Sequence, residues 1–149
     1  MMGLVMRGML AAAVGLVMAA CSYAPEAGPG GNAGPLEGTE WRLEELNGRP
    51  AVPLAPGGAP TLAFAGAEPR ASGNGGCNAF NGPYTRNGSS LDFGPLVSTR
   101  RACLDEAGNA QETAYLGALE STTRYAVYDD LLVLYAGEEV VARLRRTDG

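Results

Sequence analysis

The sequence predicts a mainly β domain of the α+β class with one helix, and three observations lead to this prediction. Short apolar runs with strand-like patterns recur between residues 41 and 144. Turn dipeptides, among them Asn47-Gly48 and Asn87-Gly88, separate these runs. One segment, residues 109–122, carries its apolar residues at helical spacing. With 149 residues, the chain has room for one such domain.

Each predicted strand is a short apolar or alternating run that ends at turn residues; the runs are residues 41–46, 61–65, 84–86, 91–93, 125–128, 131–135 and 140–144. Asn87-Gly88 is typical of a tight hairpin. The last three runs form a meander that turns at Asp129-Asp130 and at residues 136–138. Because the run 131–135 is apolar throughout, we expect this strand to be buried on both faces or to lie centrally.

The predicted helix begins near Asn109, which can cap it, and Glu112 three residues later completes a pair that resembles a capping box. Its apolar stripe at helical spacing consists of Tyr115, Ala118, Leu119 and Thr122. We expect this stripe to pack on the sheet as part of the core.

The charged residues argue against several classes of function. The chain has 11 Arg, no Lys, no His and 16 acidic residues, which gives a net charge of −5. Nucleic acid is not expected as a partner, because phosphate binding needs a basic face. Without His there is no Ser-His-Asp triad, no Cys-His pair and no ordinary zinc site. The sequence therefore favours a protein that is not an enzyme and that holds no metal or cofactor.

The first 20 residues have the pattern of a signal peptide. Arg7 lies in a short leading region, and an apolar run of 12 residues, 9–20, follows it. This run is too short to cross about 30 Å of hydrocarbon as a permanent helix. Residues 17–21, Val-Met-Ala-Ala-Cys, resemble the lipobox of bacterial lipoproteins, in which the chain is cut before the Cys and a lipid is attached to its thiol. An ordinary cleaved signal with a free Cys21 is the alternative.

A lipid on Cys21 would place the protein in the cell envelope, with the membrane as its partner. In a cell with two membranes, the resemblance favours the periplasmic face of the outer membrane, since no Asp follows the Cys. In a cell with one membrane, the outer surface is expected. Residues 21–35 form the lipidated Cys and a linker rich in Gly, Pro and Ala, which cannot fold by burial. The folded domain is expected to cover residues 36–146.

The number of cysteines is consistent with this division of the chain into a leader, a lipidated linker and a folded domain. Exported chains tend to pair their thiols, and a lipid on Cys21 leaves the even pair Cys77 and Cys103. A disulfide between them would close a loop of 27 residues, 77–103, and stabilise the fold by roughly 3–4 kcal/mol. Two buried free thiols are the alternative.

Residues 72–84 form the most distinctive stretch and are expected to be an irregular loop rich in Gly and Asn, which tolerate sharp turns. Phe80 is expected to plug this loop into the core. The motif residues of the stretch are Gly76, Cys77, Asn78, Phe80, Gly82 and Tyr84.

These residues resemble the META domain family, which includes HslJ-type heat-inducible lipoproteins. Four parts of the resemblance occur in the family's order: residues 38–43, the motif residues of 76–84, the segments 91–94 and 99–103, and the helix with Glu112, Tyr115, Leu116, Ala118 and Leu119. Arg101 departs from the family, which often has Met there. The resemblance implies a small, strongly curved antiparallel sheet or partly open barrel with one helix. It also implies roles in envelope stress and resistance to toxic compounds, and it supplies no catalytic residues.

Other patterns favour structural interpretations over functional ones. The N–H groups of residues 73–76 could cradle an anion, but the segment lacks the Lys and Ser/Thr of a phosphate loop, which favours a turn. Asp129-Asp130 is too short for a calcium loop and favours a hairpin. Adjacent carboxylates, as at Glu44-Glu45 and Asp105-Glu106, point to opposite faces of a strand, so solvated charges explain them better than a glycan-hydrolase pair. The cluster Arg143, Arg145 and Arg146 favours a solvated strand end.

The sequence thus leads to one preferred function and two alternatives. We expect a non-catalytic, membrane-anchored envelope lipoprotein that contributes to stress tolerance by binding an unidentified protein or small molecule. A carrier that holds a small ligand in a barrel-like cavity is the first alternative. An envelope glycan hydrolase is the second.

Overall fold

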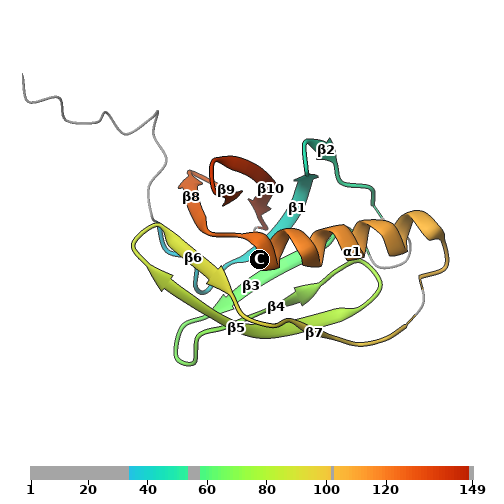
Figure 1. Cartoon of the computed structure of the whole chain (residues 1–149), viewed down its shortest axis with the longest axis horizontal. Coiled ribbons are helices and arrows are strands. Elements are labelled where there is room, and N and C mark those ends of the chain that lie inside the picture. Colours follow the sequence, from blue (N-terminus) through green and yellow to red (C-terminus); the bar gives the residue numbers. More distant parts are fainter. Residues whose placement is uncertain (1–33, 54–57, 102, 148–149) are drawn as a thin grey trace, which may run out of the picture.

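A computed structural model describes residues 34–53, 58–101 and 103–147, which form ten strands and one helix (Figure 1). In chain order these elements are β1 (Glu40–Leu46), β2 (Arg49–Pro50), β3 (Thr61–Ala65), β4 (Arg70–Asn74), β5 (Ala79–Asn87), β6 (Ser90–Phe93), β7 (Val97–Ser98), α1 (Glu106–Ser121), β8 (Arg124–Tyr128), β9 (Leu131–Ala136) and β10 (Glu139–Arg146). The predicted signal peptide, Cys21 and the linker as far as residue 33 lie outside the described residues.

The strands form one antiparallel sheet that closes on itself. Its order is β10-β9-β8-β6-β5-β4-β3-β1-β2, β10 also pairs with β1, and β7 pairs with β5. Strand pairing around the ring is sparsest between β6 and β8, whose register consists of a single residue pair, Ser90 with Arg124. The structure therefore confirms the prediction of a mainly β domain with a strongly curved, partly open barrel and one helix.

Two β-bulges help the sheet to curve. The register of β1 against β10 shifts between Leu43 and Glu45, and that of β10 against β9 shifts between Val140 and Ala142. An extra residue on one strand bends it and increases its local twist. Both bulges lie in pairings of β10, the strand that joins β9 to β1 and so closes the ring.

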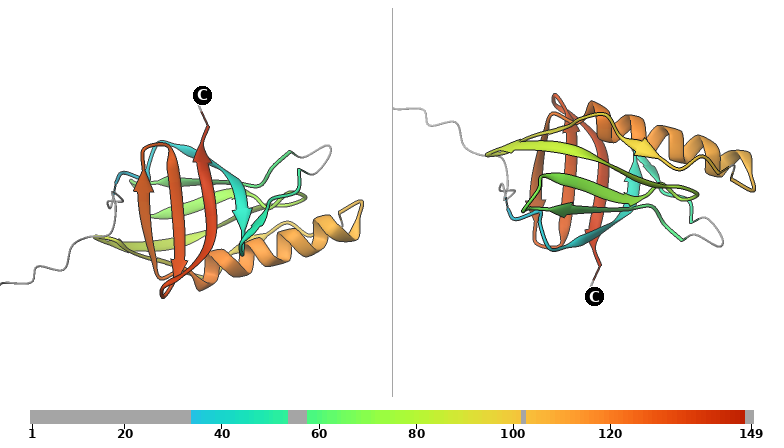
Figure 2. Two further views of the ribbon diagram at one scale, coloured as in Figure 1. Left: turned by 90° about the horizontal axis from the view of Figure 1, so that it is seen from above. Right: turned by 90° about the horizontal axis from the view of Figure 1, so that it is seen from below.

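Figure 2 shows that α1 lies across one end of the barrel and that the segment before β1 lies at the other end. The stripe predicted for the helix is buried, and Tyr115 and Leu119 are fully enclosed. Leu36, also fully enclosed, belongs to the segment at the opposite end. Between them, aromatic and leucine side chains fill the interior: Trp41, Leu62, Phe64, Phe80, Leu91, Tyr125, Leu132, Leu134 and Leu144.

Most local predictions are confirmed. All the predicted strands are present, and β9 lies centrally in the meander, between β8 and β10. The tight turn before β2 has positive φ at Asn47 and Gly48, which suits this dipeptide. In the β5–β6 hairpin, Asn87 pairs with Ser90, so the turn residues are Gly88-Ser89, one position later than expected.

Two predictions of secondary structure are wrong. Residues 72–84 are not an irregular loop throughout, because β4 and β5 pair as far as Asn74 and Ala79 and only residues 75–78 are irregular. The helix begins at Glu106, and its N-cap is Asp105, whose Oδ1 accepts a hydrogen bond from Gly108 N at 2.5 Å. Asn109 instead accepts a hydrogen bond from Cys103 N. In the described part of the chain, no helix is long and apolar enough to cross a membrane.

Candidate functional site

The motif residues come together where the loop between β4 and β5 meets α1. The loop is closed by hydrogen bonds from Gly75 N to Asn78 O (2.8 Å) and from Gly76 N to Asn74 Oδ1 (2.6 Å). Gly75 is packed so closely that a Cβ atom there would lie 2.7 Å from Cγ of Glu112. The loop therefore needs a residue without a side chain at this position.

Glu112 is bound by the two residues that follow segment 73–76, the segment whose sequence allows an anion cradle but favours a turn. Its Oε2 accepts hydrogen bonds from the main-chain N–H groups of Cys77 (2.9 Å) and Asn78 (2.8 Å), and its Oε1 accepts one from the Asn78 side-chain amide (2.5 Å). The predicted capping role of Glu112 is therefore wrong. The N–H groups of Gly75 and Gly76 bond within the loop. The successive N–H groups of the next two residues bind a buried carboxylate of the same chain.

Asn78 connects this loop to the segment before Cys103. Its Oδ1 accepts hydrogen bonds from Arg101 N (2.6 Å) and Thr99 Oγ1 (3.0 Å), and its Nδ2 donates to Arg101 O (2.9 Å). The side-chain amide thus pairs with the Arg101 main chain as a strand would. The Arg101 side chain is exposed, so the contacts that hold the segment are those of its main chain.

A disulfide joins Cys77 and Cys103, as the even pair of cysteines predicted. Together with the contacts of Asn78 and Glu112, it ties α1, the 75–78 loop and residues 99–103 into one joint, which we call the motif joint. Sulfur and carboxylate atoms of Cys77, Cys103 and Glu112 lie within 4.8 Å of one another. Since the two sulfurs are bonded to each other and Glu112 is occupied by N–H donors, this grouping serves the fold as it stands.

The remaining motif residues are also structural. Phe80 is buried, as expected, and packs edge-on against Tyr115 with ring centroids 6.0 Å apart. A Cβ atom at Gly82 would lie 2.7 Å from the carbonyl oxygen of Pro95. Tyr84 packs edge-on against Phe64 and sends its hydroxyl group towards the end of the barrel opposite α1.

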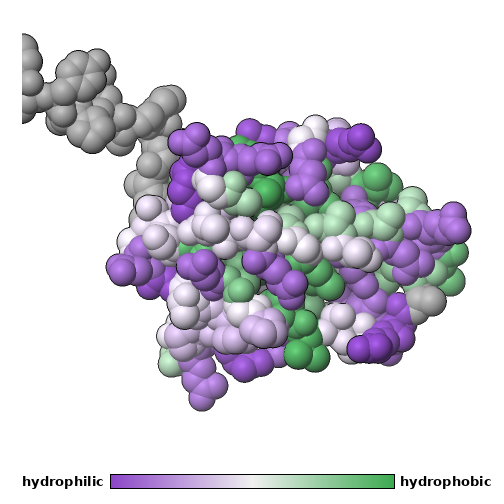
Figure 3. Space-filling model, in the orientation of Figure 1, coloured by the Kyte–Doolittle hydropathy of each residue, from purple (hydrophilic) through white to green (hydrophobic). Residues whose placement is uncertain are grey.

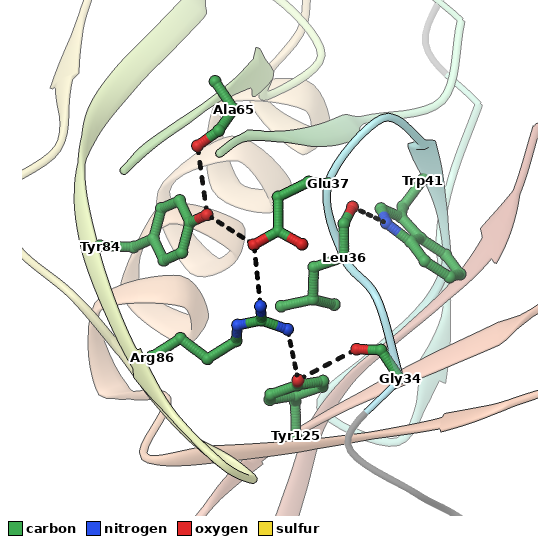
Figure 4. Close-up of polar contacts among 8 residues, drawn as sticks. All are labelled: Gly34, Leu36, Glu37, Trp41, Ala65, Tyr84, Arg86 and Tyr125. Atoms are coloured by element: carbon green, nitrogen blue, oxygen red, sulfur yellow. Dashed lines mark hydrogen bonds and ion pairs between the residues drawn. The ribbon is translucent and has the colours of Figure 1, made fainter. Parts of the chain in front are cut away.

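A polar cluster of Gly34, Glu37, Tyr84, Arg86 and Tyr125 closes that end of the barrel (Figure 4). Oε1 of Glu37 forms an ion pair with Arg86 at 3.2 Å and accepts a hydrogen bond from the Tyr84 hydroxyl at 3.1 Å. Arg86 donates to the Tyr125 hydroxyl at 3.1 Å, and that hydroxyl donates to Gly34 O at 3.1 Å. We call these residues the entry cluster, since they hold the chain where it enters the barrel.

The entry cluster shifts the ionisation of its members. A hydrogen bond from its own main chain, together with Tyr84 and the positive charge of Arg86, lowers the pKa of Glu37 against the opposing effect of burial. Burial and the neighbouring Glu37 raise the pKa of Tyr84. The hydrogen bond to Tyr125 raises the pKa of Arg86. Glu37 is therefore held as a carboxylate and Arg86 as a cation, each neutralised by the other.

The other acidic and basic groups singled out in the sequence are paired or cap elements. Glu45 pairs with Arg143, while Arg145 binds Glu44 and Asp130 at 2.7 Å each. Arg146 lies over the Trp41 ring, 5.4 Å from its centroid. Asp129 has a positive φ in the β8–β9 turn, the hairpin that the sequence favoured. Thus two members of the basic cluster on β10, Arg143 and Arg145, have acidic partners, and the third packs on an aromatic ring.

Sequence reasoning missed the entry cluster and the role of Glu112. The members of the entry cluster lie between residues 34 and 125, and no local pattern links them. One signal did exist for Glu112, which precedes Tyr115 and Leu119 by three and seven residues and so shares their face of the helix. A carboxylate on a buried stripe needs donors nearby.

Comparison with known proteins agrees with this structure. The family model described as META domain matches residues 34–148. An NMR structure of a protein from Burkholderia xenovorans is 28% identical, covers 76% of this chain and 85% of its own, and has a TM-score of 0.62. A second NMR structure, 22% identical, covers 74% of this chain and 90% of its own, with a TM-score of 0.59, and shares the fold. No curated protein matches the chain. Because the family model spans the whole barrel and its helix, the chain belongs to the META domain family.

Proposed function

We propose that this protein is a non-catalytic, membrane-anchored envelope lipoprotein that supports tolerance of stress or toxic compounds by binding other molecules. The leader of residues 1–20 and Cys21 support the anchor, and membership of the META domain family supports the envelope role. The observation that carries the proposal is the way in which the N-terminal segment is built into the barrel.

The segment after the linker is part of the core and is well suited to hold the domain at an anchor. Leu36 is fully enclosed, and Trp41 Nε1 donates to its carbonyl oxygen at 3.5 Å. The Tyr125 hydroxyl donates a hydrogen bond to Gly34 O, and Glu37 is bound by an ion pair with Arg86 and a hydrogen bond from Tyr84 (Figure 4). A lipid on Cys21 would therefore be connected, through the linker, to the end of the barrel opposite α1.

Two further observations support binding without catalysis. The oxygens of the buried carboxylate Glu112 are occupied by three N–H donors of the same chain, so they do not face a substrate. Large side chains such as Trp41, Tyr115 and Tyr125 fill the described interior, where a carrier of the first alternative would need an apolar cavity of roughly 300–1,000 Å³. Surface sites are therefore favoured over an interior chamber.

The anchor is tested with the full chain and a Cys21→Ser variant, with Ser22→Ala as the matched control. Intact-mass analysis of the wild-type and control proteins should show an acylated Cys21 at the N-terminus, in the membrane fraction. The Cys21→Ser protein should carry no acyl group and leave that fraction. An unmodified wild-type protein, or an unprocessed chain in the cytoplasm, would contradict the anchor.

The biological role is tested in a strain without the gene. We expect heat or lipophilic toxic compounds to inhibit this strain more strongly than its parent, and the wild-type gene to restore growth. The Cys21→Ser gene should restore growth less well at an equal protein level. Parental tolerance of the deletion strain under every such stress would contradict the role and leave the result on the anchor intact.

A further inference from the structure

A surface cleft of about 460 Å³ lies between the β1–β2 hairpin and α1. Its apolar walls come from both elements and consist of Leu46, Pro50, Val52 and Ala114. In Figure 3 the surface where the hairpin approaches α1 is green and pale green, with hydrophilic side chains around it. The volume falls within the range of about 300–1,000 Å³ that is typical of sites for small organic ligands. We call this feature the hairpin cleft.

The wall formed by the chain after β2 is fixed by one side chain of the helix. Gln111 accepts a hydrogen bond from Val52 N at 2.7 Å and donates one to Val52 O at 2.8 Å. Ala51 N also donates to Glu44 O at 2.8 Å. Although these main-chain groups are held, the Val52 side chain remains 52% exposed. The wall is thus preformed, and a ligand would gain affinity because little ordering is needed on binding.

The hairpin cleft also carries a positive charge that no described carboxylate neutralises. Arg49 lines the cleft and is exposed, and it takes part in none of the ion pairs among the described residues. The acidic residues of the adjoining strand, Glu44 and Glu45, are engaged by Arg145 and Arg143. The guanidinium group of Arg49 is therefore available to an anion, and its forked donors match a carboxylate.

Two other clefts in the described part of the molecule lack this combination. In the cleft of 360 Å³ beside the entry cluster, Arg86 is already paired with Glu37. The cleft of 290 Å³ beside Phe93 is lined by a carboxylate, that of Glu120, and by no cation. The hairpin cleft alone among these three joins apolar walls to an unpaired cation.

We propose that the hairpin cleft binds a free anionic amphiphile, a small molecule with an apolar body and one carboxylate. The carboxylate would contact Arg49, and the apolar body would cover Leu46, Val52 and Ala114. This binding does not depend on the anchor, so a chain without a lipid on Cys21 would bind equally well. We favour a free molecule over a membrane lipid because the volume of the cleft, about 460 Å³, suits a small organic ligand.

The test uses 2-naphthoate as the probe and 2-naphthamide as its neutral counterpart. The full chain in detergent micelles is titrated with each, while the amide NMR signals of Val52 and Gln111 are followed. Naphthoate should give saturable shifts at both residues and bind about tenfold more tightly than naphthamide, the difference expected of one charge-assisted contact. Absence of saturable shifts at these residues, or equal affinity for both probes, would overturn the proposal.

Three variants locate the contacts. Arg49→Gln should weaken naphthoate about tenfold and leave naphthamide unchanged, whereas Arg42→Gln, on an exposed arginine outside the cleft, should change neither. Ala114→Phe should fill the cleft and abolish binding of both probes, with the dispersion of the other amide signals showing that the barrel is folded. Full affinity in Arg49→Gln would overturn the role of the cation. Displacement of naphthoate by equimolar phosphatidylglycerol would overturn the choice of a free molecule.

Discussion

Glu112 binds Asn78 twice, once through the main-chain N–H group at 2.8 Å and once through the side-chain amide at 2.5 Å. The two residues are 34 positions apart, one on α1 and the other directly before β5. Because Asn78 also pairs with Arg101, this contact connects the helix to the loop on one side and to the segment before the helix on the other. In this chain the motif residues thus form a joint that places α1 over the end of the barrel.

We expect Glu112→Gln to destabilise the domain by about 2 kcal/mol. The amide would accept fewer hydrogen bonds than the carboxylate and would turn a donor towards the N–H groups of the loop, and hydrogen bonds to a buried charged group are worth about 1.5–3 kcal/mol. Glu112→Ala should cost more, because the main-chain N–H groups of Cys77 and Asn78 lose their acceptor. Chemical denaturation followed by circular dichroism would measure both changes.

Glu138→Gln is the matched control for this experiment, because Glu138 is exposed in the β9–β10 turn. A change within about 0.5 kcal/mol of the wild type is expected there. If Glu112→Gln were as harmless as Glu138→Gln, the motif joint would not position the helix.

Close packing at Gly73 gives a second prediction. A Cβ atom there would lie 2.1 Å from the carbonyl oxygen of Thr61, a main-chain atom that cannot move without disturbing β3. Gly73→Ala should therefore destabilise the domain by roughly 1–3 kcal/mol, the range typical of overpacked positions. Gly117→Ala on α1, where nothing lies within 4 Å of the added atom, should stabilise the domain by about 0.5–1 kcal/mol. Opposite signs in thermal unfolding of the two variants would verify the prediction, and equal effects would contradict it.

The strands that could be predicted from the sequence are those with their own apolar pattern. Leu62 and Phe64 alternate on β3, and β9 is apolar along most of its length, so local burial alone determines these strands. β4 has one buried apolar side chain, that of Ala71, and is extended because β3 and β5 pair with it on either side. The extended conformation of β4 thus depends on pairing with β3 and β5, and the sequence of β4 itself gives no information about that pairing.

The helix start and the entry cluster were missed for related reasons. Residues 106–111 carry little apolar pattern, so the visible stripe begins only at Tyr115 and the first turns cannot be placed by it. The entry cluster joins Glu37 to Arg86 and Tyr125 through the closure of the barrel. Closure depends on the register of every strand in the ring, and one shifted register would separate these side chains.

The entry cluster gives a third prediction, a pH-dependent contribution of Glu37 to stability. Its pKa is lowered in the fold relative to the ordinary value of 4.5, so the folded state favours the charged carboxylate. Glu37→Gln should therefore lower the melting temperature at pH 7. The difference from the wild type should persist above pH 4.5 and shrink as the pH falls through the folded pKa of Glu37.

Melting curves of the two proteins between about pH 3 and pH 7 would measure this difference, with Tyr84→Phe as a second probe of the same carboxylate. Tyr84→Phe removes one hydrogen bond to Glu37. In the Tyr84→Phe background, the effect of Glu37→Gln on the melting temperature should therefore vary less with pH than in the wild type. It should not vanish, because the ion pair with Arg86 remains. A difference between the wild type and Glu37→Gln that stays constant across this range would show that the charge of Glu37 is not what holds the N-terminal segment.

The disulfide and Glu112 act on the same loop, which gives the fourth prediction. Replacing Cys77 and Cys103 together by Ala should lower the free energy of unfolding by roughly 3 kcal/mol, because the loop between them is no longer closed in the unfolded chain. Glu112→Gln lowers it through the folded state, by releasing the N–H groups of Cys77 and Asn78. In a chain without the disulfide the 75–78 loop is already looser, so losing Glu112 should cost less than it does in the wild type. A double-mutant cycle would measure a coupling of about 0.5–3 kcal/mol between the two changes. Strict additivity would mean that the cross-link and the carboxylate hold separate parts of the fold, and that the motif joint is not one unit.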